Sequence, residues 1–292
     1  MIQQLSIIGI GLIGGSLALA LKQAGAVARV TAYARRQETL DQALALGAID
    51  YGSTDLGEAM AGAEVVVVAT PVGAMPAMFE QLAPHLTDDM VLTDVGSTKG
   101  SVVRAASMAI GQLPVGFVPG HPIAGTEQNG VGAAFADLYK NRRIILTPLQ
   151  SSHPDAIATV RQMWEACGAE VVEMGVEHHD EVLAATSHLP HMLAYALVDT
   201  LARMDESEEI FEFAAGGFRD FTRIASSNPA MWHDICVANR EAMLSVLNRF
   251  SEDLAQLTAA IEAGNSDYLL QTFTRAKGAR DRFAEKFEDS NT

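Results

Sequence analysis

Residues 5–16 read LSIIGIGLIGGS, an apolar run followed at once by glycines spaced as GxGxxG. Each glycine has a separate physical role in a strand-to-helix turn. Gly9 permits the tight turn, Gly11 lets a pyrophosphate approach the backbone, and Gly14 lets the helix and strand pack closely. The order predicts a strand over 5–8 and a helix over 15–23, with a dinucleotide site at the turn between them.

The first turn of this helix is the expected anion site. Its free N–H groups, those of Leu12 and Ile13 included, lie at the positive end of the helix dipole. Thr70 ends a second apolar run over 64–70, and we expect Thr70 and Pro71 to face the same ligand. The alternative is a glycine hinge without a ligand, but the position of the motif between a strand and a helix favours a nucleotide site.

The end of the second strand indicates which dinucleotide binds. About 20 residues beyond the glycine motif, an Asp or Glu binds the ribose 2′-hydroxyl of NAD and repels the 2′-phosphate of NADP. This chain reads Tyr33-Ala34-Arg35-Arg36 there, without an acidic residue at Ala34. Arg35 and Arg36 are suited to pair with a phosphate. We therefore expect NADP as the favoured cofactor, with NAD as the alternative if the two arginines only stack on adenine or face water.

Strand and helix patterns alternate as far as residue 174. The expected strands are 5–8, 29–33, 64–70, 90–94, 116–119, 143–147 and 170–174. The expected helices are 15–23, 37–46, 76–86, 99–110 and 154–167. Such alternation is typical of a Rossmann-type α/β fold, a doubly wound and mostly parallel sheet with helices on both faces.

After Gly175 the strand signals stop. Helical periodicity covers the ranges 176–203, 229–250, 251–263 and 266–287. We therefore expect a dinucleotide-binding domain over 1–175 and an all-helical domain over 176–292. Long helices in so short a piece of chain bury their apolar faces against one another or against a second subunit.

Charge and cysteine content narrow the partners. The 292 residues hold 20 Lys and Arg against 36 Asp and Glu, a net charge of −16, so we expect neither nucleic acid nor a membrane as a partner. The charge-free N-terminal run lacks the basic stretch of a signal peptide and is interrupted by glycines. No other stretch reaches transmembrane length without a charge or a turn signal. Cys167 and Cys236 are far apart, which fits core positions in a reducing compartment. The sequence predicts a cytoplasmic protein with a small-molecule substrate.

Two polar segments follow predicted strands, at the sheet edge where α/β proteins bind ligands. Residues 93–100 read TDVGSTKG, an order that does not match a Walker-type loop. We expect Ser97 to face a cofactor or substrate, with a helix N-cap as the alternative. Residues 120–127 read GHPIAGTE, where His121 is well placed for proton transfer.

The helical part offers a third set of polar side chains. His188 and His191 are three residues apart, and Asp220 and Arg223 share one helical face. Arg223 suits a carboxylate because its guanidinium is planar and bidentate, while a surface pair with Asp220 is the alternative.

A zinc site is not expected from the four histidines of this part, which are His178, His179, His188 and His191. Pro190 interrupts the pattern, and no Cys or closing carboxylate completes a ligand set. We interpret His178 and His179 as solvated residues at the start of a helix.

Five segments together, GIGLIGGS, TDVGSTKG, GHPIAGTE, TSHLPH and GFRDFTRIASSNPAMW, closely resemble the prephenate/arogenate (cyclohexadienyl) dehydrogenases of tyrosine biosynthesis. The last three are specific to that family in combination. The resemblance implies an oxidative decarboxylation with NAD(P). Prephenate gives a hydride to the nicotinamide, loses its ring carboxylate as carbon dioxide and becomes 4-hydroxyphenylpyruvate, while its amino analogue arogenate gives tyrosine.

The resemblance implies roles for the candidate residues. His121 takes the proton of the ring hydroxyl as a general base, and Ser97 orients His121 or the same hydroxyl. Arg223 binds a substrate carboxylate, while Glu127 and Asp220 form an ionic network with Arg223 at the mouth of the site.

Three further residues belong to the substrate site by resemblance. His191 contacts the substrate side chain, Trp232 lies near the pocket, and His188 either faces the substrate or supports a residue that does. Because a donating His191 suits the keto or carboxylate oxygen of prephenate, we expect prephenate to be favoured over arogenate. The resemblance also implies a homodimer through the helical domain and a monofunctional form, without room for a chorismate mutase or an ACT regulatory domain.

Two other functions share parts of this pattern. A β-hydroxyacid dehydrogenase shares the glycine motif and the glycine-serine loop, but it needs a catalytic lysine in the helical part, and no lysine lies between Lys140 and Lys277. A non-catalytic dinucleotide-binding dimer would keep the glycines without needing His121, His191 and Arg223 together.

Overall fold

The computed structural model describes residues 1–126 and 128–289, with the side chains of 285–289 left undescribed. The chain forms two compact units, residues 1–243 and residues 244–292. All of the predicted site residues that the structure describes lie in the first unit. The domain boundary expected after residue 175 does not coincide with this division and stays a prediction.

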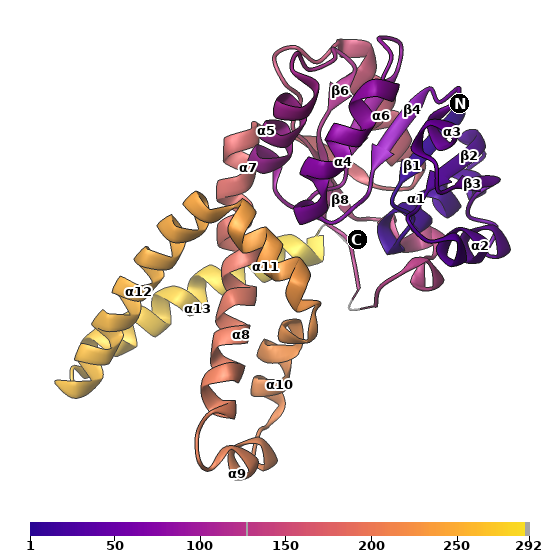
Figure 1. Cartoon of the computed structure of the whole chain (residues 1–292). Helices are drawn as coiled ribbons and strands as arrows, with labels where there is room; N and C mark the ends of the chain where they lie inside the picture. The colour runs from indigo at the N-terminus through magenta and orange to yellow at the C-terminus, as the bar shows by residue number, and fades with distance from the viewer. Residues whose placement is uncertain (127, 290–292) are drawn as a thin grey trace. The chain divides into compact units, whose positions relative to one another are not determined.

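Six parallel strands form the main sheet, in the order β3-β2-β1-β4-β5-β6 (Figure 1). Their bounds are β1 Ile2–Ile8, β2 Val27–Tyr33, β3 Tyr51–Ser53, β4 Val65–Val68, β5 Val91–Asp94 and β6 Phe117–Val118. The strand order reverses between β1 and β4, and ligands of open α/β sheets bind at the carboxyl ends of the strands at such a reversal. The predicted doubly wound parallel sheet is confirmed, and its reversal lies at the glycine motif.

Helices cover both faces of this sheet. They are α1 Leu12–Gln23, α2 Gln37–Ala45, α3 Leu56–Met60, α4 Met75–Leu82, α5 Lys99–Ile110 and α6 Pro154–Ala166, with short 3-10 turns η1 Val72–Ala74, η2 Ala83–His85, η3 Val131–Ala133 and η4 Ala136–Tyr139. Alternate residues of β4 enter two separate cores: Val65 and Val67 pack with α1 and α6, whereas Val66 and Val68 pack with α3, α4 and α5. This two-sided burial explains the unbroken apolar run of β4.

Three later strands form a second sheet, which the single-sheet prediction did not foresee. They are β7 Gly120–Pro122, β8 Arg143–Leu146 and β9 Glu170–Glu173, in the order β7-β8-β9. The predicted strand over 116–119 corresponds to β6, which joins the main sheet. β7 follows it outside the predicted range and runs antiparallel to β8. His121 therefore lies on a short strand and not in a loop.

Helices form the remainder of the chain (Figure 1). Their bounds are α7 Val176–Leu183, the π-helical turn η5 Ala184–His188, α8 Leu189–Ala202, α9 Ser207–Glu212, α10 Gly216–Thr222, the 3-10 turn η6 Arg223–Ser226, α11 Pro229–Ala238, α12 Arg240–Glu262 and α13 Ser266–Asp289. The break predicted at residue 251 is wrong, since α12 runs through Ser251, whose hydroxyl donates to Leu247 O. The break falls instead at Asn239. Within the described residues, no helix is long and apolar enough to cross a membrane.

Candidate functional site

The glycine turn has the geometry that its spacing predicted. Gly9 has φ +97°, a left-handed conformation, and a Cβ there would lie 2.9 Å from both Ala69 O and Thr70 Cγ2. A Cβ on Gly14 would lie 2.7 Å from Ile7 Cγ2, so only glycine lets α1 pack this closely on β1. Thr70 thus lies beside Gly9 at the carboxyl ends of β1 and β4, and Pro71 follows it as an exposed residue at the start of η1.

The N-terminus of α1 fits the phosphates of a dinucleotide. Among the described residues, no side chain caps the helix at Gly11, and α1 has no acidic residue in its first turn. A Cβ on Gly11 would stand in open space. The amides of Leu12 and Ile13 in that first turn have no residue four positions earlier within the helix to bind, so an anion suits them.

The adenosine end of the site lacks a carboxylate at the predicted position. Tyr33 is the last residue of β2, and the buried Ala34 follows it. Arg35 and Arg36 are both exposed, and Arg36 is the N-cap residue of α2. Two exposed cations therefore stand where the ribose 2′-position is expected.

A buried ion pair joins the loop of Ser97 to the strand of His121. Lys99 and Asp94 are both fully buried and form an ion pair, and Lys99 Nζ also donates to Gly120 O over 2.6 Å. Asp94 in turn accepts from the amide of Gly120 over 3.2 Å. These bonds fix β7 beside the β5–α5 loop, where Ser97 lies half-buried. The N-cap alternative for Ser97 is wrong, because Thr98 is the N-cap residue of α5.

His121 is buried and bound to a second histidine that sequence reasoning missed. Its Nδ1 lies 2.9 Å from Nε2 of His179, and their rings are 5.1 Å apart in an edge contact. The interpretation of His179 as solvated is wrong, since its exposed fraction is 0%. Only His178, its neighbour on α7, is exposed. Burial, together with His179 and Lys99, lowers the pKa of His121 well below its usual range.

Asp180, on α7, is hydrogen-bonded both to His179 and to the first backbone amides of α5. Its carboxylate accepts the amide of Lys99 over 2.7 Å and that of Gly100 over 2.8 Å, and Nδ1 of His179 lies 2.8 Å from Oδ1. Burial alone would raise the pKa of Asp180, but these hydrogen bonds outweigh it and lower the pKa. In the sequence, His179 and Leu183 are four residues apart and so share one helical face, which the structure buries. This spacing does not identify Lys99, some 80 residues earlier in the chain, as a partner of Asp180.

The π turn η5 aligns the histidines of the helical segment. Side chains twelve residues apart on an α-helix, such as His179 and His191, point about 120° apart at about 100° per residue. The one extra residue taken up by a π turn reduces this to about 20°. Pro190 explains the π turn, because proline lacks an amide proton and its ring crowds the carbonyl of Thr186. The proline that argued against zinc therefore orients this helix face.

The substrate candidates His188, His191 and Trp232 come together. The rings of His191 and Trp232 stack at 3.6 Å, and that of His188 makes an edge contact with Trp232 at 6.0 Å. His188 is buried, and its Nδ1 accepts from Nδ2 of Asn239, which also donates to Asp180 O. Burial lowers the pKa of His188 to about 4. Asn239, another residue that sequence reasoning missed, thus links the substrate candidates to the His121 cluster.

The predicted ionic network is described only in part. Arg223 begins η6 as an exposed residue and lies close enough to His191 to lower its pKa, an effect added to that of burial. Asp220 is exposed and pairs with Arg219, whose Nε lies 3.6 Å from Oδ1. Glu127 lies outside the described residues.

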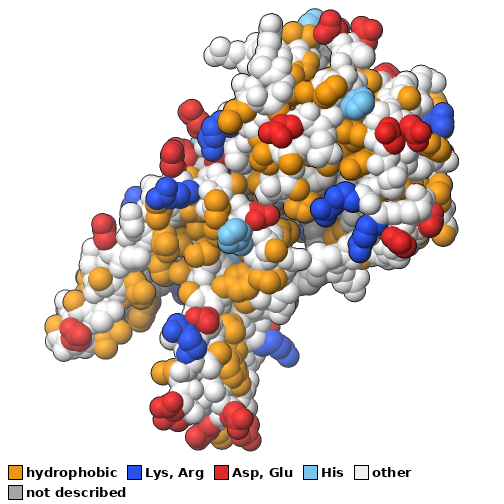
Figure 2. Space-filling view, viewed as in Figure 1, with side chains coloured by type: hydrophobic (Ala, Val, Ile, Leu, Met, Phe, Trp, Pro, Cys, Tyr) orange, Lys and Arg blue, Asp and Glu red, His pale blue; other side chains and the backbone are white. Residues whose placement is uncertain are grey.

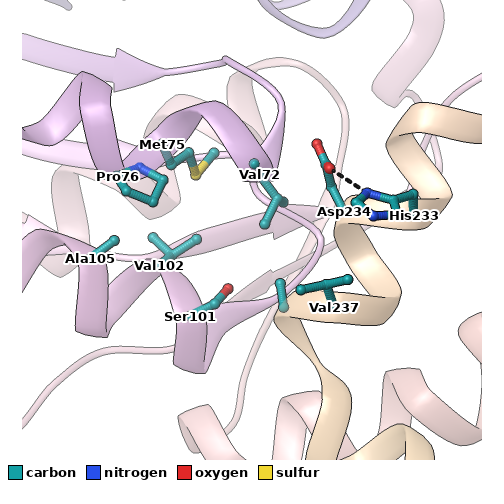
Figure 3. Close-up of a pocket in the computed structure, with 11 residues that line it drawn as sticks. Val72, Met75, Pro76, Ser101, Val102, Ala105, His233, Asp234 and Val237 are labelled. Carbon is teal, nitrogen blue, oxygen red and sulfur yellow. Dashed lines mark hydrogen bonds and ion pairs between the residues drawn. The ribbon is translucent and has the colours of Figure 1, made fainter.

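A pocket of about 240 Å³ lies between α11 and the segments η1, α4 and α5 (Figure 3). Val72, Val102 and Val237 line it, and His233 Nδ1 lies 3.0 Å from Asp234 Oδ1 at its rim (Figure 3). None of the predicted site residues lines this pocket. It is therefore distinct from the histidine cluster, which consists of His121, His179 and His188 with their partners Lys99, Asp180 and Asn239. Among the side chains that the structure describes, no three from His, Cys, Asp or Glu are placed to hold a metal ion.

Comparison with known proteins identifies the family. A family model of the prephenate dehydrogenase nucleotide-binding domain matches residues 17–173, and a model of the prephenate dehydrogenase dimerization domain matches residues 175–275. Cyclohexadienyl dehydrogenase of Zymomonas mobilis is 39% identical over 280 residues, which is 95% of each chain. Prephenate dehydrogenase of Bacillus subtilis is 37% identical over 278 residues, 94% of this chain and 74% of that relative.

A solved structure agrees with these relatives. The crystal structure of prephenate dehydrogenase from A. aeolicus, in complex with hydroxyphenyl propionate and NAD+, matches with a TM-score of 0.90 and 35% identity, over 97% of this chain and 99% of that one. The β-hydroxyacid dehydrogenase alternative is therefore wrong. The chain is an oxidoreductase with a dinucleotide-binding domain, and it belongs to the prephenate dehydrogenase family.

Proposed function

We propose that this protein converts prephenate into 4-hydroxyphenylpyruvate and carbon dioxide in tyrosine biosynthesis, with hydride transfer to a nicotinamide dinucleotide. The observation that carries the proposal is the position of His121. Its side chain is buried on β7, and one of its ring nitrogens is hydrogen-bonded to His179. A base held in this way, beside a dinucleotide site, suits the removal of a hydroxyl proton while hydride leaves the same carbon.

The cofactor is held by backbone more than by side chains. The amides of Leu12 and Ile13 bind the pyrophosphate at the uncapped start of α1, and Gly11 lets it approach. Thr70 and Pro71 border the same edge. When bound, the oxidised nicotinamide accepts the hydride from the ring carbon that bears the hydroxyl.

His121 takes the hydroxyl proton as the hydroxyl-bearing carbon becomes a carbonyl. Loss of carbon dioxide from the opposite ring carbon then leaves its bonding electron pair in the ring, which becomes aromatic. His121 returns its proton to the ring oxygen, so the product is a phenol. Ser97 lies in the loop that Lys99 and Asp94 tie to His121, and it orients the same hydroxyl or His121 itself. His121 is neutral at neutral pH because its pKa is lowered, so it is ready to accept the proton.

The carboxylate of the substrate side chain binds to Arg223. A chain with a net charge of −16 repels a dianionic substrate unless a local cation holds it. Trp232 gives the side-chain subsite an apolar wall, stacked on His191. Asp220 and Glu127 complete an ionic network around Arg223 at the mouth of the site, as the family resemblance implies.

We retain prephenate as the favoured substrate over arogenate, but for a different reason. Nδ1 of His191 lies 2.8 Å from Ser187 O and must donate to it, so the neutral ring offers only the lone pair of Nε2. The expected donor role of His191 is therefore wrong for the neutral side chain. The positive charge of Arg223 close to His191 disfavours the ammonium of arogenate instead. Arogenate is the weaker second substrate of this proposal.

NADP is the proposed preferred cofactor, and NAD is the alternative, since the A. aeolicus relative was solved with NAD+. The buried Ala34 offers no carboxylate to repel a 2′-phosphate, and Arg35 and Arg36 are exposed beside it. Arg35→Ala should lower kcat/KM for NADP about 10-fold and leave that for NAD within twofold, since a charge-assisted hydrogen bond is lost in one case only. A higher kcat/KM for NAD in the unaltered protein contradicts this preference.

A homodimer through the helical part is also proposed. Figure 2 shows hydrophobic side chains gathered along the limb that carries α12. In the unit over 244–292, Leu254 and Ile261 of α12 and Leu270 and Phe273 of α13 are each more than half exposed. Apolar faces of this size on adjoining helices are typical of subunit interfaces. Light scattering at several concentrations should give twice the mass of one chain.

Steady-state assays test the proposed reaction directly. Prephenate and arogenate are each offered with NAD and NADP, and reduced cofactor is followed by absorbance while chromatography identifies the aromatic product. We expect 4-hydroxyphenylpyruvate and reduced cofactor in equal amounts. A protein that binds the dinucleotide but turns over neither substrate is the non-catalytic alternative.

A further inference from the structure

The fully buried His179 and the half-buried Asp180 have no part in the reaction as proposed so far. His179 and Asp180 join His121 to the start of α5 through hydrogen bonds. His179 is fully buried, although a histidine at the start of a helix has no need of burial for the fold. Its two ring nitrogens both have partners.

The hydrogen-bond directions along this chain follow from its Asp180 end. The carboxylate already accepts two backbone amides, those of Lys99 and Gly100, and an ionised carboxylate is only an acceptor. Nδ1 of His179 must therefore carry a proton and donate to Asp180. Burial lowers the pKa of His179, so its ring is neutral and its Nε2 has a lone pair. That lone pair faces Nδ1 of His121 over 2.9 Å, so His121 must donate there.

We propose that His179 and Asp180 are positioning residues, which hold His121 in the tautomer with its proton on Nδ1 and its lone pair on Nε2. The inference rests on the proposed function for its consequence, since Nε2 is then the atom that accepts the substrate hydroxyl proton. Neutral histidine in water favours the opposite tautomer, so an unsupported His121 would present an N–H to the substrate where a base is needed.

The same chain stabilises His121 after it has accepted the proton. The titratable and charged groups around His121 come from four elements: His179 and Asp180 from α7, Lys99 from α5, Asp94 from β5 and His188 from η5. Lys99 opposes a positive charge on His121, and Asp94 is paired with Lys99. Asp180 is the anion that reaches His121 through unbroken hydrogen bonds, and it offsets the new charge on the imidazolium.

Nuclear magnetic resonance of the full protein tests the tautomer without any turnover. Protein labelled with ¹⁵N-histidine reports which ring nitrogen of each histidine is protonated, and the loss of signals in His121→Asn assigns those of His121. We expect His121 to be protonated on Nδ1 in the unaltered protein and to shift toward Nε2 protonation in His179→Phe. Protonation on Nε2 in the unaltered protein overturns the proposal.

Kinetics then test the consequence with matched variants. His179→Phe keeps a ring in the buried space but removes the acceptor, and kcat should fall about 10- to 100-fold, part of what a general base contributes. His179→Gln returns an acceptor oxygen and should recover part of the loss. His178→Phe changes the exposed neighbour on the same helix and should leave kcat unchanged. Wild-type kcat in a folded His179→Phe overturns the proposal.

The pH profile separates positioning from a purely structural role. Asp180→Asn keeps the shape but removes the negative charge, which makes the protonated form of His121 less stable. The acidic limb of kcat/KM should therefore move to lower pH while kcat falls. A limb at the wild-type pH means that Asp180 only caps α5, and the proposal fails. If prephenate is not turned over at all, the proposed function fails, while the tautomer measurement still decides the positioning role.

Discussion

The dinucleotide turn takes all of its glycines from one stretch, residues 9–14. The histidine cluster instead draws on β7, the start of α5, α7, η5 and the end of α11. The turn works through backbone amides and through the space that absent Cβ atoms leave. The cluster works through side chains whose pKa values are shifted by burial and by one another. The two regions face the same edge of the main sheet but depend on different physical quantities.

This difference determines what substitutions should reveal. A change in the turn alters packing or anion binding and acts on stability or on cofactor KM. A change in the cluster alters the proton affinity of a histidine or the charge that faces the substrate. It therefore acts on kcat, on substrate KM or on the pH dependence of the reaction. A change of kcat from a substitution in the turn, or a change of cofactor KM from a substitution in the cluster, would contradict this difference.

The largest effect is expected at His121. His121→Asn removes the base but keeps a polar side chain of similar bulk near His179, so kcat should fall by a factor on the order of 10²–10⁴. Cofactor KM should stay within twofold, because the amides at the start of α1 are untouched. His153→Asn, a change at an exposed histidine before α6, is the control. A kcat near that of the unaltered protein would falsify the role of His121.

Arg223 should give the next largest effect, on substrate binding. Arg223→Ala removes the cation proposed for the substrate carboxylate, and substrate KM should rise about 10- to 100-fold with a smaller change in kcat. Arg219, on the neighbouring turn, is exposed and paired with Asp220, so Arg219→Ala tests for a general charge effect. Equal KM changes in both variants would mean that overall charge, and not a specific contact, attracts the substrate.

The same contrast explains how far the sequence alone predicts this protein. The glycine turn and the buried run of β4 are local patterns, and each was predicted where the structure has it. His121 was predicted from its place after a strand. His179 and Asp180 were not, because their roles depend on partners 58 and 81 residues earlier in the chain, at His121 and Lys99. Helical periodicity predicts that a position is buried, but it does not predict which polar group will be its hydrogen-bond partner.

Two glycines of the turn should separate packing from ligand binding. A Cβ at Gly14 meets Ile7 Cγ2 at 2.7 Å and Gly9 O at 2.8 Å, so Gly14→Ala should lower the free energy of unfolding by about 1–3 kcal/mol without any cofactor. Gly11→Ala places its Cβ in open space and should leave that free energy unchanged, while cofactor KM rises about 10-fold through hindered phosphate approach. Denaturant unfolding and cofactor titration measure the two. Equal destabilisation by both variants would remove the distinction.

A further effect is expected in acid, where the histidine cluster titrates. The folded protein holds the pKa of His188 at about 4, below the 6.5 of the unfolded chain, and burial also lowers the pKa values of His121 and His179. Below pH 6.5 the unfolded state therefore binds more protons than the folded state. The free energy of unfolding must fall as the pH falls, by up to about 1.4 kcal/mol per pH unit for each such histidine.

Asp180 acts with the same sign but in a lower pH range. Its pKa is lowered in the fold, so its stabilisation is present above its unfolded pKa of 3.8 and is lost only below that value. Between pH 6.5 and about 4 the buried histidines therefore dominate. His188→Gln keeps an acceptor for Nδ2 of Asn239 but removes one titrating group. Unfolding curves at pH 7 and pH 5 should show a smaller loss of stability in this variant, since one proton fewer is taken up on unfolding. Equal losses would mean that His188 is protonated in the folded protein, and the account of a neutral cluster around His121 would fail at that residue.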